Sequence, residues 1–258
     1  MQRNATYVLG FAAIVCVVCA VVVSSAAVVL KDRQDANLAA YREQNVLEAA
    51  GFSEPGQPLS GDELTAAAAR LTPVVIDLDT GDLNATVDVA TFDQRRASTD
   101  PATSRSVDAN QARIVRIPNQ ALVYELRDDA GNLDGVVLPI EGKGLWSTLY
   151  GFVALEADLT TIRGLTYFEQ KETAGLGGEV DNPRWKALWP GRRAFDETGA
   201  TAIEVLKGAA GTVEEAPYEV DGLSGATITS RGVTYMLQFW LGDEGFGPYL
   251  DRLREETI

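Results

Sequence analysis

The first apolar block of the chain is its longest. Residues 7–30 contain no charged side chain and consist mainly of Ile, Val, Leu, Ala, Phe and Cys. A helix rises ~1.5 Å per residue, so a helix of this length crosses a ~30 Å hydrocarbon layer with some tilt. We therefore predict one transmembrane helix over residues 7–30. A cleavable signal peptide is the alternative, but the block exceeds the usual apolar region of about 7–15 residues.

The charged residues beside this predicted helix do not show which of its ends lies in the cytoplasm. Arg3 lies before it, whereas Lys31 and Arg33 follow it and are interleaved with acidic residues. The positive-inside rule therefore decides nothing here. Both cysteines, Cys16 and Cys19, lie inside the block, where a thiol acts as a small apolar side chain; a metal site shared with a partner subunit is the alternative.

The pattern after the block predicts shorter helices. Residues 34–50 are rich in Ala, Leu, Glu and Arg, so we expect the membrane helix to continue outward and to end at Gly51. Ser60 followed by Glu63 is a capping-box pattern, which predicts a short Ala-rich helix that stops before Pro73. The stretch 93–110 is polar and poor in large apolar residues, and we expect a surface loop or a poorly ordered insertion there.

Short apolar runs bounded by turn residues predict the strands. They occupy residues 74–78, 122–126, 136–140, 151–157, 162–168 and 201–205. The second and third runs form one hairpin around a turn at residues 128–132, and the fourth and fifth form another. Strands followed by a closing helix indicate an α+β domain, with antiparallel hairpins packed against helices.

The closing helix has one regular apolar face. Val233, Met236, Leu237, Trp240 and Leu241 recur at helical spacing. The helix should start near Thr227, where unpaired N–H groups and the helix dipole favour an anion. Locally, the residues before it are also typical of a simple helix cap, because Ser and Thr oxygens accept hydrogen bonds from the same N–H groups.

Composition excludes several classes of function. The net charge is −15 and the pI is about 4.4, which argues against nucleic acid as a partner. The chain has no histidine, so a Ser-His-Asp or Cys-His mechanism is impossible. Residues 222–226 also fail the Gly-x-Ser-x-Gly pattern of a hydrolase, because Ala226 stands at the second glycine position.

Two glycine-rich loops could hold a flat ligand. In residues 142–146 the glycines allow close backbone approach, and Trp146 offers a stacking face; a turn before a core tryptophan is the alternative. In residues 169–178, Thr173 and nearby N–H groups could bond the edge of a heterocycle while Leu176 packs on its face; plain turn glycines are the alternative. Lys207 could pair with a phosphate or a reduced flavin, or be a solvated surface charge.

Known nucleotide fingerprints are missing. The sequence contains neither a Gly-x-Gly-x-x-Gly turn opening a helix after a strand nor a phosphate-binding Gly-x-x-x-x-Gly-Lys-Ser/Thr loop. A flavin bound here would need another tether. The hydroxyl of Thr227 can supply one, because it can form a phosphoester at the start of a helix.

Residues 221–227, Asp-Gly-Leu-Ser-Gly-Ala-Thr, resemble the flavinylation motif Asp-x-x-Ser/Thr-Gly-Ala-Thr of FMN-binding domains, whose last threonine carries FMN through its phosphate. The resemblance extends to residues 142–146, to the loop 172–177 and to the apolar block. In the order of these features and in its overall length, the chain is similar to the C-subunit family of the sodium-translocating NADH:quinone oxidoreductases. Ala174 departs from the pattern where many relatives have proline.

The resemblance implies an electron-transfer subunit with FMN attached covalently to Thr227, and no metal site. Its partners would be the other subunits of the complex, the lipid bilayer, and a flavin transferase that attaches the FMN, a modification for which Asp221 would be needed. It also implies the set of cofactor-binding residues: Thr227, Ser224, Gly225, Ala226, Trp146, Glu172, Thr173, Leu176 and Lys207. Of these, Ser224, Gly225 and Thr227 would surround the phosphate, and Trp146, Thr173 and Leu176 the ring. Thr229 and Ser230 would be ordinary residues of the first helical turn.

The implied organisation places the soluble domain outside the cytoplasmic (inner) membrane, on the periplasmic side. The parts are a cytoplasmic tail (1–6), the membrane helix (7–30), a membrane-proximal region (31–115), the FMN-binding domain (116–245) and a C-terminal helix (246–258).

Two alternative functions stay open. One is the G subunit of an Rnf-type complex, which usually has a shorter region after the anchor. The other is an anchored flavin-binding or assembly module without a redox role.

Overall fold

The computed structural model describes residues 5–257 and divides the chain into two units, the first ending at Glu43 and the second beginning at Gln44. The predicted cytoplasmic tail therefore lies largely outside the described residues. Helix α1 (Ala5–Ala49) is continuous, and it is long and apolar enough to cross a membrane. It ends as predicted: Gly51 adopts a positive φ of 76°, and the N–H of Phe52 bonds to the carbonyl of Leu47.

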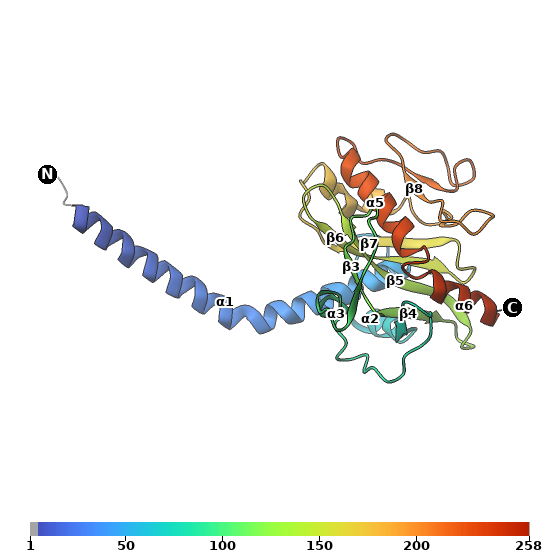
Figure 1. The fold of residues 1–258 in the computed structure, drawn as a ribbon, viewed down its shortest axis with the longest axis horizontal. Helices are drawn as coiled ribbons and strands as arrows, with labels where there is room; N and C mark the ends of the chain where they lie inside the picture. Colours follow the sequence, from blue (N-terminus) through green and yellow to red (C-terminus); the bar gives the residue numbers. More distant parts are fainter. Residues whose placement is uncertain (1–4, 258) are drawn as a thin grey trace. The chain divides into compact units, whose positions relative to one another are not determined.

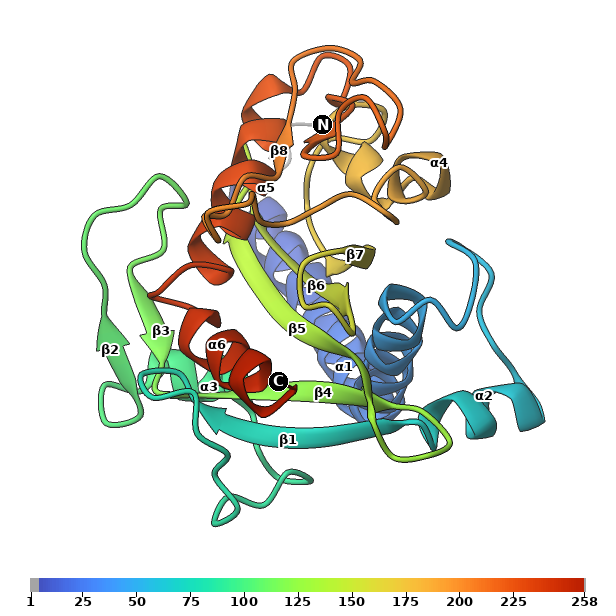
Figure 2. The same ribbon diagram turned by 90° about the vertical axis from the view of Figure 1, so that its right-hand side faces the viewer.

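The second unit (Figure 1) is built on one antiparallel sheet of five strands in the order β1-β4-β5-β6-β7, which are labelled in Figure 2. The strands are β1 (Leu71–Asp77), β4 (Gln120–Arg127), β5 (Leu133–Lys143), β6 (Thr148–Glu156) and β7 (Ile162–Glu169). Both predicted hairpins are present, β4 with β5 and β6 with β7. Pro73 is accommodated because β1 is an edge strand.

Smaller elements complete the unit. They are α2 (Gly61–Ala68), α3 (Gln94–Thr99), β2 (Ser104–Ser106), β3 (Arg116–Pro118), a 3-10 helix (Gly177–Asp181), α4 (Pro183–Lys186), β8 (Glu204–Val205), β9 (Glu219–Val220), α5 (Thr227–Trp240) and α6 (Gly247–Thr257). Helix α2 follows Ser60 as predicted, but the Ser60 side chain makes no capping hydrogen bond.

Both faces of the sheet are covered. Val136 and Leu138 of β5 join the core formed with α5 and α6, whereas Val137 between them packs with Val46 and Ala49 from the end of α1. Figure 2 shows α5 beside β5 and α6 across β4. The α6 contact includes a hydrogen bond from the Tyr249 hydroxyl to Glu125 Oε1 (3.1 Å). Strand β5 thus buries successive residues on opposite faces, which explains its nearly continuous apolar run.

Two predictions about local structure were wrong. The stretch 93–110 contains α3 and β2, because Asp93 caps the helix by accepting the N–H of Arg96 (3.0 Å) and β2 pairs with β3. Polar side chains here bond to the local backbone, a source of order that low hydropathy does not reveal. The strand predicted over 201–205 shortens to β8, which pairs with β9 in a parallel arrangement, unlike the expected antiparallel strands.

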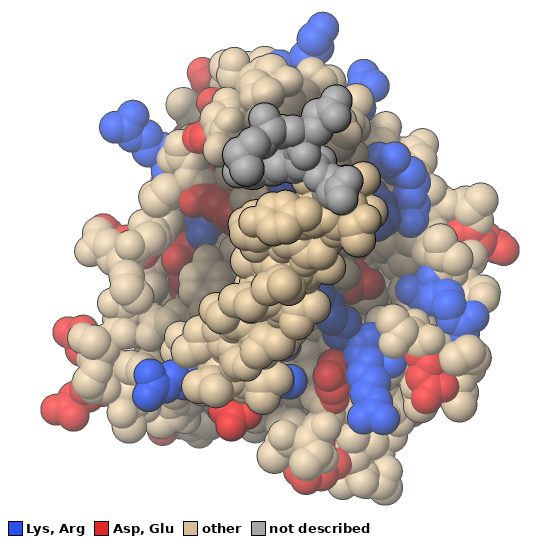
Figure 3. Space-filling model, turned by 90° about the vertical axis from the view of Figure 1, so that its left-hand side faces the viewer, with Lys and Arg blue, Asp and Glu red and all other residues tan. Residues whose placement is uncertain are grey.

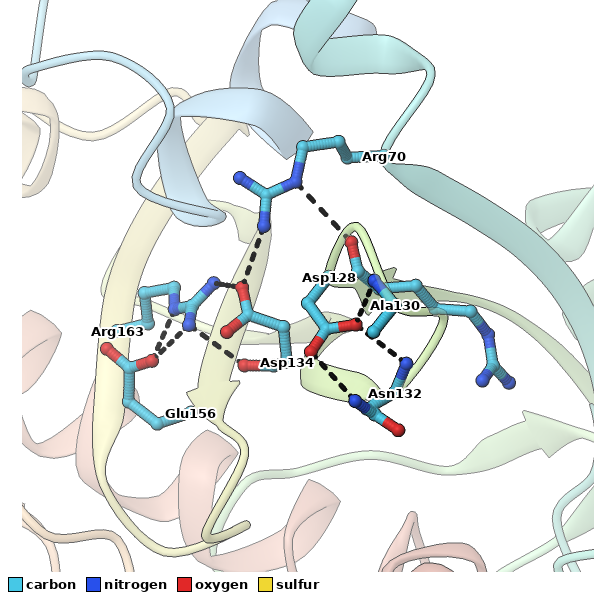
Figure 4. Close-up of polar contacts among 8 residues, drawn as sticks. Arg70, Asp128, Ala130, Asn132, Asp134, Glu156 and Arg163 are labelled. Carbon is cyan, nitrogen blue, oxygen red and sulfur yellow. Dashed lines mark hydrogen bonds and ion pairs between the residues drawn. The ribbon is translucent and has the colours of Figure 1, made fainter.

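A charged cluster links the turn ends of the two hairpins (Figure 4). Arg163 Nη1 lies 3.0 Å from Asp134 Oδ2 and also pairs with Glu156, and Arg70 reaches the same Asp134 oxygen at 3.3 Å. The hydrogen bond from Arg163 holds the pKa of Asp134 below its ordinary value. Elsewhere acidic and basic side chains are interspersed, as the face in Figure 3 illustrates, while the apolar part of α1 carries none.

Candidate functional site

Helix α5 begins at Thr227, as its apolar spacing predicts, and its predicted inner face is buried. Gly222 and Gly225 make the approach to the helix possible. A side chain at Gly222 would collide with the carbonyl oxygen of Leu206 (Cβ at 2.1 Å), and Gly225 adopts a left-handed φ of 70°. Ala226 occupies the N-cap position without a side-chain hydrogen bond. The first-turn N–H groups of α5 are therefore open to a ligand.

Thr227 itself is half-buried, and within residues 5–257 its hydroxyl makes no hydrogen bond. It lines a cavity of about 220 Å³ together with Lys207 and Arg231. The structure thus brings Lys207, predicted from sequence, next to Thr227. Arg231 was missed, although its position one helical turn after Thr227 is a signal for a shared face.

Glu172 ties the two glycine-rich loops to α5. Its carboxylate accepts the N–H groups of Leu145 (3.1 Å), Trp146 (2.9 Å) and Ser147 (2.9 Å), as well as the hydroxyl of Thr229 (2.7 Å). Burial raises the pKa of this carboxyl, but the hydrogen bonds from Thr229 and the backbone outweigh burial, so the pKa of Glu172 lies below its ordinary value. Glu172 is therefore an anionic anchor for the loops.

Two glycines leave room for the Glu172 carboxylate and the Thr229 hydroxyl. A Cβ on Gly144 would lie 2.7 Å from Glu172 Oε1, and a Cβ on Gly177 would lie 2.6 Å from Thr229 Oγ1. Thr229 and Ser230 are not ordinary first-turn residues, contrary to the prediction. Thr229 donates to Glu172, and the Ser230 hydroxyl accepts the N–H of Leu223 (3.1 Å), so both fix the turn from inside.

Several large apolar side chains near this anchor are exposed. Trp146 is 73% exposed, which excludes the alternative of a core tryptophan, and its neighbour Leu145 is 46% exposed. Leu176 is 43% exposed and lies against the motif, since a Cβ on Gly225 would be 2.9 Å from its Cδ2; Ile228, next to Thr227, is 49% exposed. Apolar side chains held at a surface in this way are typical of a ligand or partner site.

The remaining predicted residues lie at the edges of this arrangement. Asp221 stabilises the turn: its Oδ1 accepts the N–H of Ala210 (2.7 Å), and its carbonyl accepts the indole N–H of Trp185 (2.8 Å). Ser224 is exposed. Thr173 is exposed too, and its carbonyl accepts the N–H groups of Leu176 and Gly178. Neither Ser224 nor Thr173 lines the cavity beside Thr227.

The family model described as FMN-binding domain matches residues 144–242, the segment that contains Glu172, Lys207 and Thr227. Together with the apolar helix α1, this match defines the class of protein: a protein with an FMN-binding domain that follows a helix long and apolar enough to cross a membrane.

Relatives cover nearly the whole chain. The C subunit of the Na(+)-translocating NADH-quinone reductase of Pseudomonas aeruginosa is 43% identical over 98% of both chains, and that of Vibrio vulnificus is 45% identical over 92% of this chain and 91% of its own. The crystal structure of Shewanella oneidensis NqrC superposes with a TM-score of 0.75 at 40% identity, covering 83% of this chain and 96% of that one. The chain belongs to the NqrC family, the C subunits of the Na(+)-translocating NADH-quinone reductases.

Proposed function

We propose that the chain is an electron-transfer subunit of a sodium-pumping NADH:quinone oxidoreductase and that it carries FMN in ester linkage on Thr227. One observation carries the proposal. The Thr227 hydroxyl has no hydrogen bond among the described residues, and it stands at the uncapped start of α5 beside a cavity shared with Lys207 and Arg231. The NqrC relatives and the FMN-binding domain model support the same interpretation.

The phosphate end of FMN fits the groups around Thr227. Open N–H groups and the positive end of the α5 dipole favour an anion, and Lys207 and Arg231 add cationic charge. The turn formed by Ser224, Gly225 and Ala226 holds Thr227 at this end. None of these groups would have to move far, because Gly222 and Ser230 already fix the turn.

The ring of FMN fits the exposed apolar side chains. Trp146 and Leu176 offer flat and aliphatic surface, and Thr173 lies at the start of the loop that carries Leu176. Glu172 has a different role from direct ring contact. Its carboxylate holds the N–H groups of the loop that carries Trp146 and the hydroxyl of Thr229, so it positions both loops against α5.

Attachment would be a phosphoryl transfer from FAD, carried out by a separate flavin transferase with a divalent metal. Thr227 Oγ1 forms a bond to the phosphorus on the flavin side, the pyrophosphate P–O bond breaks, AMP leaves, and the hydroxyl proton goes to solvent. Asp221 would be part of the surface that the transferase recognises. Its Oδ1 accepts the Ala210 N–H, which holds the motif to the neighbouring loop.

When bound, FMN supplies the electron transfer, and the chain positions it and sets its surroundings. The helix α1 would keep the domain at the membrane, with the soluble domain on the periplasmic side. Labelling of engineered surface cysteines by a membrane-impermeant maleimide in whole cells tests that orientation. Labelling only after cell lysis would contradict it.

Mass spectrometry of the protein from its native host tests the attachment. We expect an FMN-sized mass addition on the peptide that contains Thr227, and loss of that addition in Thr227→Ala. An unmodified Thr227 peptide would refute the linkage. For the redox role, Thr227→Ala should stop quinone reduction by the assembled complex, whereas unchanged turnover would leave the alternative of an assembly module.

A further inference from the structure

A second cavity, of about 420 Å³, shares no lining residue with the cavity beside Thr227. Its walls come from α3, from the stretch around the start of β3, and from the adjacent ends of β5 and β6. Strand alternation places it on the opposite face of the sheet from α5. A Cβ on Gly142 would point to α5, 2.8 Å from the Met236 Cβ, so the side chains of its neighbours Glu141 and Lys143 point to the opposite face, where they line the cavity. The volume is that of a small-molecule pocket.

The walls of this cavity are cationic in an acidic protein. The chain has 22 Lys and Arg against 37 Asp and Glu, yet Arg95, Arg113, Arg116 and Lys143 all line the cavity beside a single carboxyl, that of Glu141. Within residues 5–257, Arg113, Arg116 and Lys143 form no ion pair. Arg95 pairs with Glu169 (3.0 Å). Three of the four cations therefore have no ion-pair partner among the described residues.

Neutral groups hold these cations in place. Arg116 donates to Ser104 and Ser106, and Lys143 Nζ donates to Thr148 Oγ1 (2.7 Å). Arg113 Nη2 donates to the Gly144 carbonyl (3.2 Å), and its backbone is left-handed with a φ of 56°. Such bonds order the side chains but leave their charge available to an anion.

The carboxyl of Glu141 does not cancel the attraction of this cavity for an anion. Its carboxyl makes no ion pair among the described residues, and burial raises its pKa, although Arg95 and Lys143 act in the opposite direction. Burial thus works against a full negative charge on the wall of the cavity.

We propose that this cavity is a binding site for a phosphate group, held by Arg113, Arg116 and Lys143. Guanidinium and ammonium donors from two segments, the stretch at the start of β3 and the end of β5, line this one cavity and suit an oxyanion with several acceptor oxygens. The phosphate could belong to a soluble phosphate compound or to the headgroup of an anionic lipid, since both present the same chemistry. The site shares no residue with the cavity proposed for the flavin phosphate, although Lys143 lies in the loop that carries Trp146.

Calorimetric titration of the full chain in a phosphate-free neutral detergent, at constant ionic strength, tests the proposal. One arm titrates inorganic phosphate, and the other titrates short-chain dihexanoyl phosphatidylglycerol against dihexanoyl phosphatidylcholine. We expect one saturable site per chain for at least one of the two anionic probes. Binding of inorganic phosphate identifies a soluble source, and binding of the anionic lipid alone identifies a headgroup. If neither inorganic phosphate nor the anionic lipid binds with a Kd below about 10 mM, the proposed site is overturned.

Variants assign the binding to the cavity. Arg113→Gln and Lys143→Gln should each weaken binding by about tenfold or more, because each removes a charged donor. Arg184→Gln, at an exposed arginine outside the cavity, should leave binding unchanged. Glu141→Gln must not weaken it. Circular dichroism spectra identify any variant that fails to fold. Equal affinity in the wild type and in the folded cavity variants would overturn the proposal.

Discussion

Glu172→Gln tests the idea that one carboxylate organises the candidate site. Glu172 Oε1 accepts the N–H groups of Trp146 and Ser147 and the Ser147 hydroxyl, and Oε2 accepts the Leu145 N–H and the Thr229 hydroxyl. Glutamine has the same shape but only one acceptor oxygen. If that oxygen stays with Trp146 and Ser147, the amide NH₂ faces the Leu145 N–H, donor against donor.

The expected loss of stability follows from the number of hydrogen bonds that lose or weaken their acceptor. An N–H group left without a partner costs about 1–3 kcal/mol, and the remaining bonds weaken because their acceptor is no longer charged. We therefore expect Glu172→Gln to lower the free energy of unfolding by about 2–4 kcal/mol at neutral pH. The substitution should also loosen the loop that carries Trp146, because that loop loses part of its anchor.

Urea unfolding of the full chain in detergent measures this change. Tryptophan fluorescence is a suitable probe, because Trp185, Trp189 and Trp240 are buried and report on the domain interior. Glu197→Gln is the matched control: this glutamate is exposed and its substitution should change the free energy by less than about 0.5 kcal/mol. A change that small in Glu172→Gln would refute the reasoning.

The pH dependence adds an independent check. The pKa of Glu172 in the folded protein lies below the ordinary value of 4.5. Its ionised form therefore stabilises the fold fully above that ordinary value, and the contribution is lost as the pH falls through the lowered pKa. The difference in unfolding free energy between the wild type and Glu172→Gln should shrink over the same range. A difference that stays constant from pH 7 down to pH 3 would contradict an ionised anchor.

Three further predictions concern packing and charge. Gly177→Ala places a Cβ 2.6 Å from Thr229 Oγ1 and should cost about 1–3 kcal/mol in the same urea assay, whereas Gly208→Ala, in open space, should be close to neutral. Trp146→Ala should lower the unfolding free energy by less than about 1 kcal/mol because the side chain is 73% exposed, yet it should shift the visible absorption of bound flavin; an unchanged spectrum would count against the ring assignment. Lys186→Met leaves the Glu48 carboxylate, which is 13% exposed, with the Gly56 N–H but without its ion-pair partner at 2.9 Å, and should cost about 3–5 kcal/mol. The double variant with Glu48→Leu should recover much of that loss, and no recovery would contradict the ion-pair explanation.

The sequence alone predicted the elements whose pattern is local. The apolar block, both hairpins and the closing helix each show a period or a turn signal that no other structure satisfies as well. It failed at 93–110, where short side chains such as Asp93 bond to the backbone of α3, and at 201–205, where only a distant partner strand defines β8. Order at those places comes from polar contacts and from pairing, which hydropathy does not record.

The candidate site divides in the same way. Residues 221–227 predicted a helix start with a threonine open to an anion, because glycine placement and helix dipoles are local properties. Only the tertiary structure decided that Glu172, Thr229 and Ser230 fix this turn, that Arg231 joins Lys207 beside Thr227, and that Trp146 faces solvent. The physical reason is that hydrogen bonds and burial between segments far apart in the chain depend on how the sheet brings its loop ends together.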